Sequence, residues 1–145
     1  MKIIIDKRFY ELACNTFPEV EFYQEIEECL EAEALIGEPK NIKPEILEKM
    51  PNLRWVQSFR AGYDSIDLEY LKKRKITFCN AKDIFSVPIA EDVVCKILIH
   101  NTNALNYIED QKSHRWGFKR RFELCGQTIG IIGTGSIATE IAKRL

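Results

Sequence analysis

The sequence predicts an α/β protein with a parallel sheet that carries helices on both faces, followed by one further β-α unit. Short apolar runs alternate with helical patterns through residues 1–80. Such alternation produces right-handed crossovers between parallel strands. A glycine-rich turn near residue 135 then separates another apolar run from an amphipathic helix. These observations place ligand sites beyond the carboxyl ends of the strands.

The composition excludes several classes of protein. The 145 residues are 46% hydrophobic and 30% charged, with a net charge of −1, which is typical of one ordinary globular domain. This balance favours neither a nucleic acid nor an anionic membrane as a partner. No apolar run approaches the length of a membrane span, and residues 1–6 resemble a strand rather than a signal peptide.

The cysteines and histidines do not indicate a metal site. The five cysteines are scattered, and neither histidine stands at ligand spacing. Free thiols are typical of a reducing compartment, so a cytoplasmic location is expected. We expect no catalytic role for His100 or His114, since lone histidines are most often structural or exposed.

The elements of the first 80 residues follow in a regular order. Five strands are expected, at residues 2–5, 20–23, 34–37, 53–58 and 76–79. Helices are expected at residues 8–17, 44–49 and 67–75, the second with proline in its first turn. Polar or glycine-containing segments follow four of the strands, at Asp6, Gly37, 58–62 and 80–83.

A long helix is expected next, from Pro88 to about Asp110, because apolar residues recur at close to the 3.6-residue period. A polar segment with three large aromatic residues follows, at 111–125. Exposed aromatic residues in such an arm often mark an interface.

The fingerprint of a dinucleotide site lies in residues 128–138. A strand is expected at Thr128–Ile132, followed by a G-x-G-x-x-A turn and a helix. The expected cofactor-binding residues are Gly133, Gly135, Ser136, Ile137 and Ala138. Gly133 suits the tight turn, Gly135 lets a pyrophosphate approach, and Ala138 allows close packing of helix and strand. The alternative is an ordinary strand-to-helix turn of a parallel sheet.

Several motifs together resemble the D-isomer-specific 2-hydroxyacid dehydrogenases. Residues 52–58 and 61–67 are similar to the family's strand and its A-G-x-D-x-x-D loop. Residues 76–81 resemble a strand that ends in asparagine, and residues 87–91 resemble the start of the helix that joins the two domains. Residues 124–137 resemble the beginning of the nucleotide-binding domain. The resemblance extends over essentially the whole chain.

The resemblance implies a flavodoxin-like substrate domain at residues 1–88, an interdomain helix and dimerisation arm at residues 89–125, and the start of an incomplete Rossmann domain at residues 126–145. It also implies an oxidoreductase that interconverts a small 2-oxo acid and a D-2-hydroxy acid. NAD is the implied cofactor, with NADP as the alternative. The substrate carboxylate would bind the loop formed by Arg60, Ala61, Gly62 and Tyr63. Ser136 and Ile137 would supply amides to the pyrophosphate.

The family's catalytic arginine, glutamate and histidine have no counterpart in the 145 residues. We therefore expect a truncated chain that is inactive alone and binds NAD poorly. A homodimer through residues 89–125 is expected, and a non-catalytic dimerising module is the alternative function. A flavodoxin-like receiver or FMN-binding module is less favoured, because no phosphate-binding loop follows the first strand.

Overall fold

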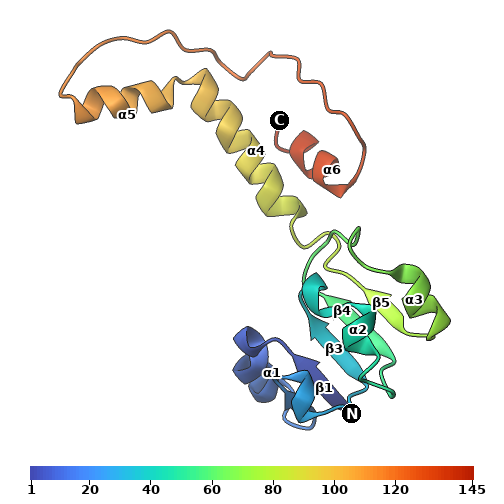
Figure 1. Ribbon diagram of the computed structural model, residues 1–145. Coiled ribbons are helices and arrows are strands. Elements are labelled where there is room, and N and C mark those ends of the chain that lie inside the picture. Colours follow the sequence, from blue (N-terminus) through green and yellow to red (C-terminus); the bar gives the residue numbers. More distant parts are fainter. The chain divides into compact units, whose positions relative to one another are not determined.

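The computed structural model describes residues 1–145 as two compact units, Met1–Lys82 and Asp83–Leu145 (Figure 1). The first unit contains a five-stranded parallel sheet with the order β2-β1-β3-β4-β5. This is the flavodoxin-like order, with the first strand placed inside the sheet. The predicted fold class is therefore confirmed. The strands are β1 (Lys2–Ile5), β2 (Glu21–Tyr23), β3 (Ala34–Gly37), β4 (Trp55–Ser58) and β5 (Thr77–Cys79).

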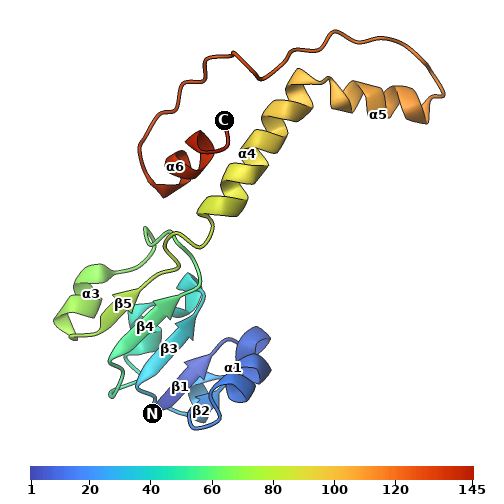
Figure 2. The same ribbon diagram turned by 180° about the vertical axis from the view of Figure 1, so that it is seen from behind.

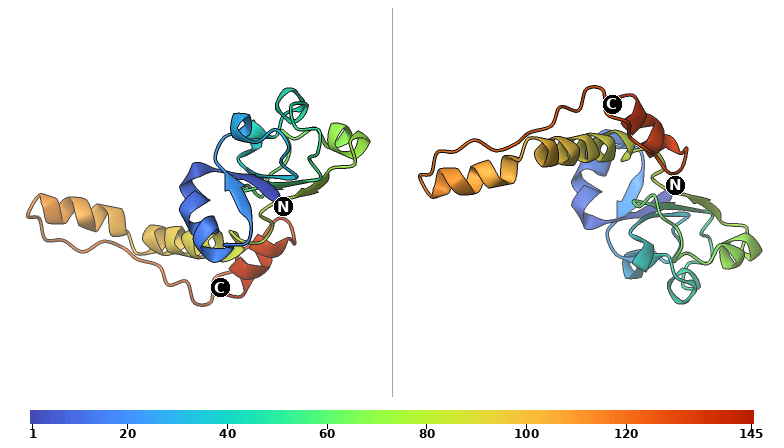
Figure 3. Two further views of the ribbon diagram at one scale, coloured as in Figure 1. Left: turned by 90° about the horizontal axis from the view of Figure 1, so that it is seen from below. Right: turned by 90° about the horizontal axis from the view of Figure 1, so that it is seen from above.

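Helices cover both faces of this sheet. The chain steps from β1 to β2 in one direction, and from β3 through β4 to β5 in the other. Right-handed crossovers then place α1 (Tyr10–Thr16) on one face, and α2 (Pro44–Leu47) and α3 (Leu68–Lys73) on the opposite face. Figures 2 and 3 show the sheet between these two sets of helices. Because both faces are covered at β1, Ile3, Ile4 and Ile5 are all buried.

The main core lies on the face that carries α2 and α3. Ile4, Leu35 and Val56 stand opposite one another on neighbouring strands, and all three are buried. They pack in one cluster with Leu47 and Met50, among others. Full burial of a side chain of this size contributes roughly 1.5–3 kcal/mol. These contacts fix the sheet whose carboxyl edge carries the candidate site.

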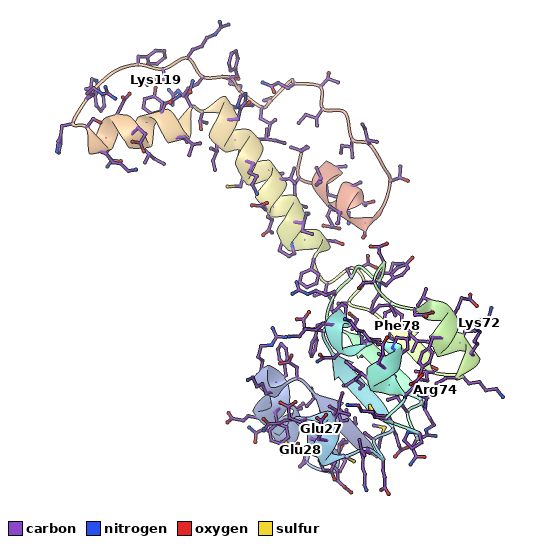
Figure 4. The ribbon with its side chains drawn as sticks, in the orientation of Figure 1. Glu27, Glu28, Lys72, Arg74, Phe78 and Lys119 are labelled. Carbon is purple, nitrogen blue, oxygen red and sulfur yellow. The ribbon has the colours of Figure 1, made fainter.

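Arg74, labelled in Figure 4, follows α3 and lies at the edge of this core. Its guanidinium donates hydrogen bonds to the carbonyl oxygens of Leu47, at 2.6 Å, and Met50, at 2.9 Å. It also lies 5.9 Å from the centre of the Tyr70 ring. The end of α2 and the end of α3 are thereby joined by one side chain.

The second unit contains three helices: α4 (Ser86–Asn101), α5 (Ala104–Lys112) and α6 (Ser136–Ala142). The prediction of a single helix from Pro88 to about Asp110 is wrong, because α4 ends at Asn101 and α5 begins only at Ala104. Asn103 takes a left-handed conformation there, with φ 58°. Asparagine tolerates this conformation better than most residues. Its side-chain amide also donates to the carbonyl oxygen of Arg120, at 2.7 Å.

The arm that follows α5 is irregular but is held to the helices of its own unit. The hydroxyl of Tyr107 accepts a hydrogen bond from the amide of Lys119, at 2.9 Å. The carboxylate of Asp110, which is mostly buried, pairs with Lys119 at 2.7 Å and with Arg115 at 3.2 Å. Figure 4 shows Lys119 on the arm above α5. The ammonium group of Lys119 is the main cause of the lowered pKa of Asp110.

The predicted strand at Thr128–Ile132 is not formed, whereas the helix expected after it is present as α6. Residues 127–134 have no strand partner. A strand is stabilised through pairing with a neighbour, and residues 83–145 contain no other strand. Ile132, which would lie inside a sheet, is fully exposed. Local sequence preference alone was therefore insufficient for this strand.

All five cysteines are free. No group of three or more histidine, cysteine, aspartate or glutamate side chains is placed to hold a metal ion. None of the helices combines the length and the apolar character required to cross a membrane.

Candidate functional site

The loop after β4, at residues 59–67, carries the four residues predicted to bind substrate: Arg60, Ala61, Gly62 and Tyr63. It lies at the carboxyl edge of the sheet, where the segments that follow β1, β3 and β5 also begin. The structure therefore brings these four residues together at the edge where parallel sheets bind ligands. Tyr63 is half exposed, at 49%.

Three neighbouring residues hold this loop by its backbone. The buried hydroxyl of Ser58 accepts a hydrogen bond from the amide of Arg60, at 3.0 Å. From the end of β5, the amide of Ala81 donates to the carbonyl oxygen of Arg60, at 3.1 Å. The side-chain amide of Asn80 donates to the carbonyl oxygen of Ala61, at 2.6 Å. The carbonyl oxygens of Arg60 and Ala61 are thus both bound by the two residues that follow β5.

Three successive amide N–H groups of the loop are free. Those of Ala61, Gly62 and Tyr63 donate to no backbone or side-chain oxygen. Successive unpaired amides form a concave site that attracts anions. Gly62 has no left-handed φ, and a Cβ there would lie 3.8 Å from a carboxylate oxygen of Asp64. The free amides, rather than an unusual glycine conformation, are what this loop offers to a carboxylate.

A cleft of about 650 Å³ lies at the same edge of the sheet and includes Arg60 in its lining. Glu38, which directly follows β3, links two arginines across it. Its carboxylate accepts from the guanidinium of Arg8 at 2.9 Å and from Nε of Arg60 at 2.8 Å. Arg8 is also bound by Asp6, through Nε at 2.8 Å. Four alternating charges therefore connect the ends of β1, β3 and β4.

These ion pairs shift the titration of their members. The guanidinium of Arg8 lowers the pKa of Asp6 from 3.8 to about 2. Hydrogen bonds from Arg8, and then from Arg60, also lower the pKa of Glu38. The bonds to Asp6 and Glu38 raise the pKa of Arg8. These shifts all favour the charged forms, so Asp6, Arg8 and Glu38 are ionised at neutral pH.

The predicted cofactor residues lie together at the beginning of α6. Gly133 takes φ +100°, a left-handed conformation that favours glycine. Gly135 precedes α6 and leaves open space where a Cβ would stand. The first-turn amides of Ser136, Ile137 and Ala138 have no partner inside the helix. The hydroxyl of Ser136 accepts a hydrogen bond from that of Ser86, at 3.0 Å.

The sequence did not reveal the contributions of Glu38, Ser58 and Asn80. Glu38 and Arg60 stand 22 positions apart and meet only because β3 and β4 are neighbours. The available signal was an acid directly after one strand and a base shortly after the next. His100 and His114 lie on α4 and after α5, both exposed, and neither has a carboxylate partner.

Comparison with known proteins identifies the family. Residues 1–143 match the catalytic domain of the D-isomer specific 2-hydroxyacid dehydrogenases. The chain is 29% identical, over 119 residues, to glyoxylate/hydroxypyruvate reductase B of Escherichia coli K12. This match covers 79% of the chain but only 37% of that reductase. The chain thus spans little more than a third of this curated relative.

Solved structures agree with the assignment. A D-isomer specific 2-hydroxyacid dehydrogenase family protein from Aeromonas salmonicida superposes with a TM-score of 0.80 at 29% identity, over 97% of this chain and 48% of its own. The D-lactate dehydrogenase of Aquifex aeolicus, solved with NAD and lactic acid, gives a TM-score of 0.81 at 22% identity, over 99% of this chain and 47% of its own. The chain belongs to the D-isomer specific 2-hydroxyacid dehydrogenase family.

Proposed function

We propose that these residues serve an oxidoreductase that interconverts a 2-oxo acid and a D-2-hydroxy acid. The observation that carries the proposal is the row of free amides at Ala61, Gly62 and Tyr63, held open by Ser58 and Asn80. A carboxylate is common to both 2-oxo acids and 2-hydroxy acids. These amides are donors for it, and Arg60 adds a positive charge beside them.

NAD is the proposed cofactor, and NADP is the alternative. The turn at Gly133–Ala138 fits a dinucleotide pyrophosphate, since Gly133 is left-handed and no side chain crowds Gly135. A bound nicotinamide supplies the hydride that such a reaction requires. Ser136 and Ile137 would hold the phosphates through their amides.

The substrate site is tested by adding pyruvate to the 15N-labelled chain and following amide shifts. The amides of Ala61, Gly62 and Tyr63 should move together and saturate. Ser58→Ala removes the acceptor that orients the Arg60 amide, and should weaken binding about fivefold. Ser65→Ala, in the same loop, removes a hydroxyl that makes no hydrogen bond and should leave binding unchanged. Unmoved loop amides would contradict the proposed site.

We further propose that residues 1–145 by themselves do not turn over a substrate. Proton transfer to the substrate oxygen requires an acid–base group, and both histidines are exposed on the second unit without a carboxylate partner. The absorbance of NADH at 340 nm should stay constant with a panel of 2-oxo acids. Steady oxidation of NADH by the purified chain would refute this statement.

The alternative function is that of a dimerising module, with residues 89–125 as its interface. Trp116 and Phe118 are exposed at 104% and 85%, and Leu105 at 66%. A homodimer would give a mass of twice 16.9 kDa by light scattering at micromolar concentration. The double variant Trp116→Ser and Phe118→Ser should reduce this mass to that of the monomer. Phe17→Ser, which changes an exposed phenylalanine of the first unit, is the control. A monomeric native chain would contradict the proposal.

A further inference from the structure

Arg60 belongs both to the amide loop and to the lining of the cleft at the carboxyl ends of β1, β3 and β4. Its backbone follows the Ser58 anchor, while its side chain extends to Glu38. Of residues 60–63, Arg60 alone lines this cleft, so a ligand carboxylate on the amides of 61–63 would reach the cleft through a tail that extends past Arg60 toward its guanidinium. The tail of the substrate is the part that the cleft would contact.

The side chain of Arg60 is held by Glu38, but not all of its hydrogen-bond donors are used. Glu38 accepts from Nε only, and the two terminal nitrogens, Nη1 and Nη2, make no hydrogen bond. Arg8, in contrast, donates from both Nε and Nη2 to Asp6 and also from Nη2 to Glu38. Glu38 thus holds one edge of the Arg60 guanidinium and leaves its terminal donors available. A planar pair of donors matches the two oxygens of a carboxylate.

The charge of the cleft favours a second anion over an apolar tail. Its lining includes four cations, which are Lys7, Arg8, Lys40 and Arg60, against three carboxylates. Asp6 and Glu38 are already bound by the arginines, whereas Lys7 and Lys40 form no ion pair. The cleft therefore has a net charge of +1, with unpaired cationic groups that face the same space.

We infer that the cleft beside the amide loop recognises a second carboxylate, so that the substrate is a dicarboxylic 2-oxo acid. The first carboxylate occupies the amides of Ala61, Gly62 and Tyr63. The second binds the terminal nitrogens of Arg60, with Glu38 as the positioning residue for that guanidinium. This inference rests on the proposed function, because it extends the same substrate site.

The test compares two ligands of one shape. 2-Oxoglutarate carries the second carboxylate, and 5-methyl-2-oxohexanoate carries a pair of methyl groups in its place. Amide shifts of the 15N-labelled chain give both affinities. We expect 2-oxoglutarate to bind about fivefold more tightly, the upper range for an exposed ion pair. In Arg60→Gln both ligands should lose affinity, because the positive charge beside the amides is removed, and the ratio of the two affinities should fall to about one.

Two further variants serve as controls. One separates the charge of Arg60 from the geometry of its guanidinium, and the other tests the loss of an ion pair elsewhere on the same two strands. Arg60→Lys keeps the positive charge but lacks the planar pair of guanidinium donors. It should therefore retain a preference for 2-oxoglutarate of about twofold. Arg54→Gln breaks an Arg–Glu pair with Glu33 at the amino ends of the same two strands, and should leave the preference intact. The dispersion of the amide spectrum verifies that each variant is folded.

The outcomes distinguish this inference from the proposed function. Equal affinity for the two ligands, with shifts at 61–63, would overturn the second carboxylate and leave the 2-oxo acid site standing. A preference for 2-oxoglutarate that persists in both Arg60 variants would overturn the assignment to Arg60. The absence of any shift at 61–63 with either ligand would overturn both.

Discussion

Arg8 is the residue on which the charged groups of the cleft converge. It binds Asp6 from its own strand end and Glu38 from the end of β3, and Glu38 in turn binds Arg60. An ion pair on an open surface stabilises a protein little, because solvent screens it and the side chains lose entropy. Asp6 and Glu38 are mostly shielded, with 15% and 16% of their side chains exposed. Their contribution should therefore exceed that of a surface pair.

Replacement of Asp6 by asparagine should make the free energy of unfolding depend less on pH in the acid range. The pKa of Asp6 is 3.8 unfolded and about 2 folded, so the native carboxylate stabilises the protein above pH 3.8 and loses this effect as the pH falls to 2. After allowance for solvent screening, Asp6→Asn should cost about 1 kcal/mol at pH 7 and almost nothing at pH 2. Urea unfolding across this range provides the measurement.

The control for Asp6 is Glu19→Gln, since Glu19 is exposed and forms no ion pair. Its unfolding free energy should follow that of the native chain at every pH. A constant difference between Asp6→Asn and the native chain down to pH 2 would show that the ion pair with Arg8 is not the source of the stability.

At the scale of elements, the sequence was sufficient wherever a strand or helix packs on the sheet of the first unit. Apolar runs such as residues 2–5 and 34–37 are predicted correctly because burial and local preference agree there. The loop at 60–63 follows from its place after β4. Its partners Glu38 and Asn80 could be assigned only once the strand order was known, because they come from neighbouring strands.

The second unit was harder to predict for physical reasons. Thr102 and Asn103 interrupt an apolar pattern that continues at the helical period on both sides, so the sequence favoured one helix. The break coincides with the left-handed conformation of Asn103 and its hydrogen bond to Arg120, neither of which periodicity describes. The segment 128–132 has strong strand preference but no partner, and preference without pairing did not produce a strand.

Substitution of Asn103 should reveal the left-handed turn between α4 and α5. Asn103→Gly and Asn103→Ala both lose the bond to Arg120, but only glycine adopts φ 58° without strain. The alanine variant should therefore be less stable than the glycine variant by about 1 kcal/mol. Hydrogen exchange of the α5 amides measures this difference.

The same pair of substitutions at Asn106, inside α5, should give the opposite order. Glycine is less favourable than alanine in a helix interior, by about 1 kcal/mol. If alanine were the better residue at both positions, the left-handed conformation of Asn103 would not contribute to the break.

At the scale of the molecule, the two units differ in how much they bury. The first contains the sheet and almost the entire apolar core. In the second, Ala90 is the only hydrophobic residue that is buried, beside the polar Ser86, Asn101 and Asp110. Cooperative unfolding depends on a shared core. The first unit should therefore contribute most of the free energy of unfolding of the chain.

A fragment of residues 1–82 should fold by itself and unfold in urea with the same midpoint as the sheet in the complete chain. A fragment of residues 83–145 should unfold without a cooperative transition, because it buries too little apolar surface to offset its conformational entropy. Circular dichroism of both fragments provides the measurement. A non-cooperative fragment 1–82 would show that the first unit requires residues of the second.

The two tryptophans are divided between the units, and this gives the molecule two built-in optical reporters. Trp55 lies half-buried on β4, whereas Trp116 is fully exposed on the arm. With Trp116→Phe, the remaining emission should begin blue-shifted and move to the red only when the sheet unfolds. With Trp55→Phe, the emission should begin red and remain accessible to a soluble quencher, unless another protein surface covers the arm. The emission of Trp55 alone would thus report unfolding of the sheet. The emission of Trp116 alone would report association through the arm.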